Sequence, residues 1–241
     1  MTKTTKREIR FGDRPWAARR DFQRFLGVYL LDRASGIYID QDTPDHDRRL
    51  ISATFRQMPV DLQRLCREYE VTFSTCAHCT ASGNSSAFYG DFSGSKESIS
   101  PHIEMSSASL TPDLVLPHMT HEAGHLWWRT LPHEARRDYS RFLGATCPPE
   151  TVEVTEYAHE HFLNSLKAAT TGVDEGCSEC RRRRCQDVWT EESFCETVAV
   201  LHVPAHQSRR CDSTVNLPSR RQAIGDIAGL RIGSANGGPT H

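Results

Sequence analysis

The chain has 241 residues, of which 37% are hydrophobic and 25% charged, as is typical of a globular protein with a good-sized core. Its net charge of −2 predicts no general affinity for nucleic acid, and no apolar run approaches the length needed to span a membrane. The opening segment, Met1 to Arg7, is polar and basic. We therefore expect no classical signal peptide, and either a cytoplasmic location or export by a non-classical route.

The first seventy residues carry patterns of secondary structure but no chemical signature. Glu8–Phe11 reads as a short strand, and apolar residues recur at helical spacing from Pro15 to Leu31. A further helical pattern runs from Asp47 to Arg67 and is interrupted at Pro59. We interpret these segments as scaffold.

Three later segments have the β-branched and aromatic residues typical of strands. They are Val71–Thr75, Ala87–Gly90 and Ser98–Met105. In the last segment, Pro101 has no N–H to donate to a ladder, so we expect this strand to lie at the edge of the sheet. An ordinary hairpin is the alternative interpretation of the last two segments.

The segment from His121 to His125 reads His-Glu-Ala-Gly-His, which has the form HExxH. It lies within Pro117–Arg129, where apolar residues recur with the period of a buried helix. Because residues four apart share a helix face, both imidazoles can bind one metal ion. Glu122 follows about 100° further round the helix and is the expected general base. Two incidental histidines on a core helix are the alternative.

A catalytic zinc site has three protein ligands and an open position for water, so a third ligand must come from elsewhere. The best candidates lie in Glu192-Ser193-Phe194-Cys195-Glu196, which we expect in a helix with Thr190 as its N-cap. Glu192 and Glu196 would lie one turn apart, so that one binds the metal and the other accepts a hydrogen bond from a ligating imidazole. The rivals of Glu192 as third ligand are Glu196, His159 and His161.

These two motifs carry a resemblance to a known family. An HExxH followed at a distance by an ExxxE helix resembles the gluzincin zinc metallopeptidases. The form E-x-F-[AC]-E at Glu192–Glu196 is similar to the anthrax-lethal-factor-like branch of that family. The resemblance covers roughly Phe88 to Val203.

The resemblance implies one catalytic Zn²⁺, with His121, His125 and Glu192 as its ligands and Glu196 in the outer shell. It also implies that a polypeptide substrate binds as an extended strand. In this branch a Tyr shortly before the ligand Glu stabilises the oxyanion. The matching stretch of this chain, Cys185–Thr190, holds no Tyr. The nearest candidate is Tyr157, with His159 and His161 as alternatives.

Nine cysteines include two Cys-x-x-Cys pairs, Cys76 with Cys79 and Cys177 with Cys180. Together the pairs could bind a second, structural zinc ion. They lie much further apart along the chain than the pairs of a zinc ribbon, and disulfides or free thiols are the alternatives. The run Arg181–Arg184 reads as a solvated loop or as a site for an acidic partner.

We therefore predict an α+β protein with a zincin-like metalloprotease fold. It would have a small mixed sheet, an edge strand over the HExxH helix, and a C-terminal helical part. Residues 1–205 would form the catalytic domain, interrupted by a Cys- and Arg-rich insertion at 172–188. Residues 206–241 would form a short helix, from Pro218 to Leu230, and a disordered Gly-rich tail.

The predicted function is that of a zinc-dependent metalloendopeptidase, in which Glu122 takes a proton from metal-activated water as it attacks the peptide carbonyl. One alternative is a non-catalytic zinc-binding or partner-binding module with a vestigial HExxH. Another is a toxin-like or effector protease that acts on a specific host protein. A third is a hydrolase of the same metal type that cleaves a small-molecule amide or ester. No nucleic-acid or membrane partner is expected.

Overall fold

A computed structural model shows an α+β protein that divides into two compact units, Met1–Leu126 and Trp127–His241. The boundary between the units falls within one helix, α4 (Val115–Thr130). The structure describes residues 6–8, 28–76, 87–91, 101–107, 110–170, 178–203 and 217–228.

The first unit contains a six-stranded mixed sheet with the strand order β1-β2-β3-β4-β6-β5. The pairs β3–β4 and β4–β6 are parallel, and the remaining pairs are antiparallel. The predicted mixed sheet is therefore confirmed. Its strands are β1 (Lys6–Glu8), β2 (Val28–Asp32), β3 (Ile37–Asp40), β4 (Thr72–Cys76), β5 (Ala87–Asp91) and β6 (Pro101–Ser106).

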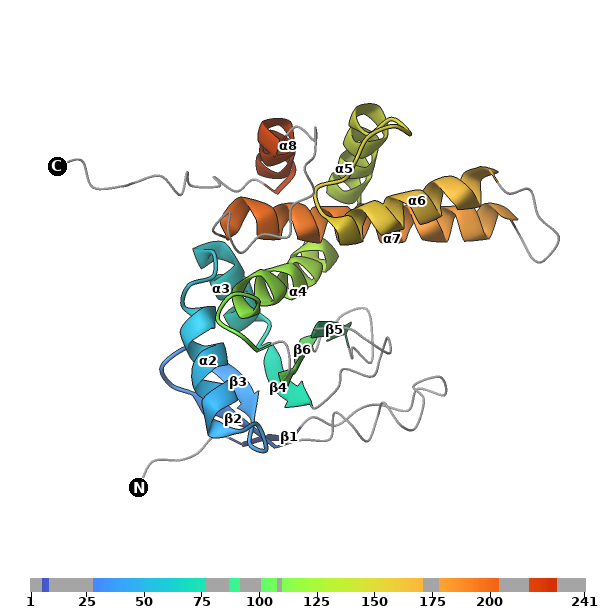
Figure 1. The fold of residues 1–241 in the computed structure, drawn as a ribbon. Helices are drawn as coiled ribbons and strands as arrows, with labels where there is room; N and C mark the ends of the chain where they lie inside the picture. The colour runs from blue at the N-terminus through green and yellow to red at the C-terminus, as the bar shows by residue number, and fades with distance from the viewer. Residues whose placement is uncertain are drawn as a thin grey trace, which may run out of the picture. The chain divides into compact units, whose positions relative to one another are not determined.

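An apolar part of the core of this unit lies on one face of the sheet. Ile39, Phe73 and Ile103 stand side by side on β3, β4 and β6, and each is at most 1% exposed. Phe55 at the end of α2 (Asp45–Phe55) packs edge-on against Phe73, with the ring centroids 6.1 Å apart. Helix α3 (Val60–Glu68) follows directly after Pro59, which separates the two helices as predicted (Figure 1).

Two sequence-based predictions about the strands of this unit are wrong. The expected helix from Pro15 to Leu31 cannot extend to its end, because Val28–Asp32 is strand β2. The run Val-Tyr-Leu-Leu favours a strand, and Tyr29 is buried against His102 of β6, with ring centroids 5.8 Å apart. The remainder of that expected helix, residues 15–27, lies outside the described residues. The N-terminal strand is found two residues earlier than predicted, at Lys6–Glu8.

The second correction concerns the edge of the sheet. Strand β6 lies between β4 and β5, and all six of its residues are buried, so it is an internal strand and β5 ends the strand order. Pro101 is the first residue of β6, a position where a missing N–H is tolerated. The proline therefore marks the beginning of the strand and not the edge of the sheet.

The second unit is helical. It contains the end of α4 with α5 (His133–Thr146), α6 (Glu156–Thr170), α7 (Ser178–His202) and α8 (Leu217–Ala228). Helices α6 and α7 lie side by side along their lengths (Figure 1), joined by Phe162 and Trp189, whose ring centroids are 5.0 Å apart. A second aromatic cluster surrounds Phe194 of α7, with centroids 5.2–5.3 Å from those of its neighbours Trp127, Trp128 and Tyr139.

Helix α7 begins earlier than the sequence predicted. Thr190 is inside the helix, where its Oγ1 donates a hydrogen bond to the Gln186 carbonyl at 2.8 Å, so it is not an N-cap. The expected solvated loop of Arg181–Arg184 is likewise helical. The short C-terminal helix is confirmed as α8, and the Gly-rich tail lies outside the described residues. None of the helices within the described ranges combines the length and apolar character needed to cross a membrane.

Candidate metal centre

Helix α4 carries the HExxH motif and forms for local reasons. Pro117 lies in its first turn, where a residue without an N–H loses no intrahelical bond. Met119, Ala123 and Leu126 recur at i, i+4 and i+7, and all three are fully buried. With this stripe packed into the core, the adjacent face of the helix presents His121, Glu122 and His125.

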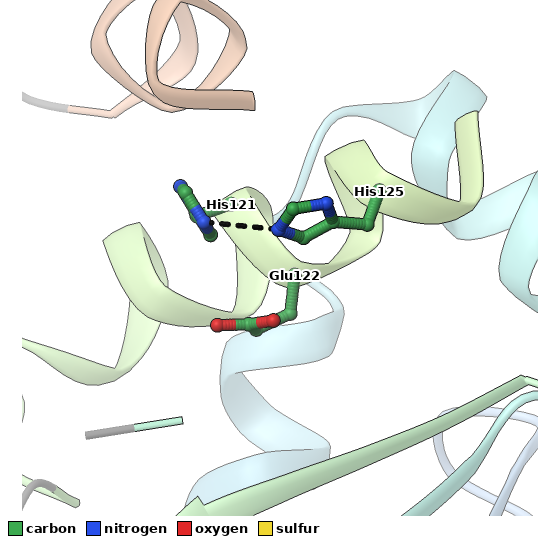
Figure 2. A group of neighbouring side chains, drawn as sticks. All are labelled: His121, Glu122 and His125. Atoms are coloured by element: carbon green, nitrogen blue, oxygen red, sulfur yellow. Dashed lines mark hydrogen bonds between the residues drawn. The ribbon is translucent and has the colours of Figure 1, made fainter. Parts of the chain in front are cut away.

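The two imidazoles of the motif point toward one another (Figure 2). His121 Nε2 and His125 Nε2 are 3.2 Å apart, and the ring planes are inclined at 78°. The Glu122 carboxylate lies beside them, and one ligand atom from each of the three residues falls within 4.8 Å of the others. Glu122 is buried, at 8% exposure, whereas the two imidazoles are half-buried.

This geometry fits a single metal ion. Two Zn–N bonds of usual length at a tetrahedral angle place the nitrogens roughly 3.3 Å apart. The distance of 3.2 Å between the two Nε2 atoms agrees with that separation. The donor set of two imidazoles and a carboxylate also suits zinc and other divalent transition metals. The structure therefore supports a candidate metal-binding group at His121, Glu122 and His125, the part of the predicted site that it brings together.

Glu192 and Glu196 lie on α7, in the second unit, one helical turn apart and each half-buried. Their proposed roles, as third ligand and outer-shell acceptor, stay predictions. Their neighbour Glu191 accepts a hydrogen bond from Arg129 Nε at 3.1 Å, in a partly exposed ion pair. Glu191 is therefore occupied by a structural contact.

The candidates for stabilising the oxyanion lie on α6. Tyr157 is 48% exposed, and its ring packs edge-on against His161 with centroids 4.7 Å apart. His159 Nδ1 accepts a hydrogen bond from the Glu153 backbone N–H at 3.4 Å, and its ring lies near Phe162. His159 thus has a local structural role, while the catalytic role of Tyr157 and the ligand roles of both histidines stay predictions.

The second, structural zinc ion also stays a prediction. Cys79 and Cys177 lie outside the described residues, as do the side chains of Cys76 and Cys180. Among the described residues, Cys66, Cys147, Cys185 and Cys195 form no disulfide. Cys195 is fully buried beside Phe194, as expected of a small core residue.

A buried charged cluster that contacts α7 was not predicted from the sequence. Arg220 of α8 and Glu153, which precedes α6, form an ion pair of 2.7 Å, with side chains 1% and 0% exposed. Arg220 Nη2 also lies 3.1 Å from the Cys147 sulfur. Burial, reinforced by the charge of Glu153, raises the pKa of the Cys147 thiol to about 11 even though Arg220 opposes the shift. An arginine in a short polar helix gives no sequence signal that it will be buried.

A comparison of the chain with protein-family models, curated proteins and solved structures finds no match. The chemistry of the site is therefore inferred from its own residues. Two imidazoles with a buried carboxylate on the same helix can hold a divalent ion and accept a proton next to it.

Proposed function

We propose that the protein is a zinc-dependent metalloendopeptidase. His121, His125 and Glu192 hold the ion, and Glu122 is the general base. The observation that carries the proposal is the 3.2 Å separation of two imidazole nitrogens on successive turns of α4, with a buried carboxylate beside them. We include Glu192 as the third ligand because its motif is similar to that of the gluzincins.

Each residue of the proposed site has its own role in the reaction. When bound, a divalent ion supplies Lewis acidity, which lowers the pKa of water and polarises the peptide carbonyl. Glu122 accepts the proton of the attacking water and delivers it to the leaving nitrogen. Glu196 accepts a hydrogen bond from the ring N–H of a ligating imidazole and so fixes its tautomer. Tyr157 donates a hydrogen bond to the developing oxyanion.

The substrate is a polypeptide that binds in an extended conformation. Strand β5 (Ala87–Asp91) supports this, because it is the last of the described strands in the sheet order and pairs with β6 on one side. The outer N–H and C=O groups of such a strand can pair with an added peptide strand. We therefore propose that the substrate pairs with β5.

Substitution of Glu122 by Gln tests the mechanism. We expect the variant to stay folded and to keep its zinc, because glutamine is isosteric and the three proposed ligands are untouched. Cleavage of a peptide library should fall by about 10²–10⁴-fold, the usual contribution of a general base. The measurements are zinc content by elemental analysis and cleavage rates with and without a chelator.

The matched control is Glu160→Gln, which removes an exposed carboxylate from α6 and should leave the cleavage rate unchanged. Full activity of the Glu122 variant would show that the base is assigned to the wrong residue. If the native protein binds zinc but cleaves nothing in the library, a non-catalytic zinc-binding module becomes the better interpretation.

A further inference from the structure

The buried pair of Arg220 and Glu153 is connected to α7 through two hydroxyl groups. Arg220 Nη1 donates hydrogen bonds to Ser193 Oγ at 2.7 Å and to Thr197 Oγ1 at 3.2 Å. Ser193 Oγ in turn donates to Glu153 Oε2 at 3.3 Å. Both hydroxyl-bearing residues are fully buried, so the guanidinium joins α8, α7 and the segment before α6 without contact with water.

The two residues that receive these bonds have a particular place in the sequence. Ser193 follows Glu192 directly, and Thr197 follows Glu196 directly. Successive helix residues are about 100° apart, so the hydroxyls occupy the face next to that of the two acids. Because the two hydroxyls are one turn apart and bind the same guanidinium nitrogen, they restrict both rotation of α7 about its axis and sliding along it.

The energetics of buried ion pairs indicate that this pair has a role other than stabilising the fold. A buried ion pair is weak evidence for stability, because well-packed hydrophobic residues of similar volume are often as stable. Hydrophobic side chains lack direction, however, and cannot fix the rotation of a helix as hydrogen bonds do. Tyr139 of α5 adds a further hydrogen bond to this turn, with its OH 3.5 Å from Thr197 Oγ1.

We propose that Arg220, together with Glu153, is a positioning residue for the metal site. It holds the Ser193–Thr197 turn of α7 so that the carboxylates of Glu192 and Glu196 project in the direction needed to bind and support the ion. This inference rests on the proposed function, in which Glu192 is the third ligand. It assigns α8 a role in metal binding although no residue of α8 is a ligand.

A variant that separates stability from positioning provides the test. The double substitution Glu153→Leu with Arg220→Met removes both charges and keeps similar side-chain volume. In the presence of a chelator, its thermal unfolding midpoint should stay within a few degrees of the wild-type value. Its zinc affinity, measured by competition with a chromogenic chelator, should fall about tenfold or more, as for outer-shell variants. Wild-type zinc affinity in the folded double variant would overturn the proposal.

The single substitution Arg220→Lys tests the same proposal if the double variant does not fold. Lysine keeps the charge but lacks the fork that reaches Glu153 and both hydroxyls together. Zinc affinity should again fall, and an unchanged affinity would overturn the proposal. The matched control is Asp138→Asn with Arg141→Gln, which removes an exposed ion pair of 3.2 Å on α5 and should leave the zinc affinity unchanged.

The same measurement in a Glu192→Gln background shows where a failure lies. If Glu192 is the ligand that Arg220 positions, the double substitution should cost little further zinc affinity once Glu192 is replaced. If the double substitution lowers zinc affinity equally with Glu192 present and with Glu192 replaced, the positioning role of Arg220 is wrong. The proposed function would not be affected by that result. If Glu192→Gln by itself leaves zinc affinity unchanged, the ligand assignment in the proposed function is wrong, and the inference falls with it.

Discussion

The nitrogen atoms of His121 and His125 are close enough to share one ion, but two imidazoles alone make a weak and unselective site. Catalytic zinc sites have three protein ligands, and the nature of the third affects both affinity and the acidity of bound water. Glu122 is buried beside the imidazoles, and its carboxylate can either bind the ion or accept a proton. The choice between these roles depends on whether another carboxylate supplies the third ligand.

Alanine substitutions of Glu192 and Glu196 test that choice. We expect Glu192→Ala to weaken zinc binding far more than Glu196→Ala, because the first removes a direct ligand and the second an outer-shell acceptor. Loss of an outer-shell acceptor typically costs about 10–100-fold in metal affinity. The measurement is a zinc competition titration of both variants at the same pH. The reverse order would move the metal site by one turn of α7.

At the scale of elements, the hairpin of β2 and β3 is tied to α2 by one carboxylate. Asp32 Oδ2 accepts hydrogen bonds from the Ser35 N–H at 2.9 Å, from the Ser35 hydroxyl, and from Ser52 Oγ of α2 at 2.6 Å. The turn also needs Gly36, whose φ of +75° is unfavourable for other residues. Burial alone raises the pKa of Asp32, but the hydrogen bonds from Ser35 and Ser52 outweigh it and lower the pKa.

A pH-dependent contribution to stability follows from this lowered pKa. It is fully present above the unfolded-state pKa of about 3.9 and is lost as the pH falls through the lower folded-state value. Asp32→Asn should therefore reduce the free energy of unfolding by about 1 kcal/mol at pH 7, and the difference should shrink at acidic pH. Urea unfolding at several pH values measures the effect.

The control for this substitution is Asp61→Asn on α3. Asp61 forms an exposed pair with Arg64 at 2.9 Å, with side chains 38% and 68% exposed. Exposed pairs contribute about 0–1 kcal/mol, so this variant should unfold almost as the wild type does. Equal losses in both variants would mean that the hydrogen bonds to Asp32 give no special stabilisation.

For the molecule as a whole, the proposed zinc ion should contribute to stability as well as to the proposed catalysis. An ion that binds only the folded state stabilises it by about 4 kcal/mol when its free concentration is 1,000 times its dissociation constant. We therefore expect a chelator to lower the thermal unfolding midpoint by several degrees, and added zinc to restore it. The measurement is scanning calorimetry with and without the chelator.

Variants of the motif provide the controls for chelation. Glu122→Gln should keep the zinc-dependent shift, because that residue is proposed as a base and not as a ligand. His125→Ala should abolish the shift, because it removes a ligand. A shift that survives in the His125 variant would mean that the stabilising ion binds elsewhere, for example at the Cys-x-x-Cys pairs.

The local features of this protein could be read from its sequence because they depend on neighbouring residues. Helical periodicity alone places His121 and His125 on one face of α4, and Pro59 separates α2 from α3. Strand composition likewise identified the segments of β4, β5 and β6. In contrast, Thr190 resembles an N-cap but lies inside α7, because a threonine hydroxyl can also bond to the preceding helical turn.

Only the tertiary structure decided which strand is internal and which charge is buried. Strand β6 lies between β4 and β5 because of pairings with distant segments, and Pro101 is compatible with that place as well as with an edge. Arg220 is buried because Glu153, Ser193 and Thr197 surround its guanidinium, and these partners lie 23 to 67 residues away. The sequence by itself determined the candidate metal-binding pair, since a helix repeats every few residues. Strand order and charge burial depend on contacts between remote segments, which no local pattern encodes.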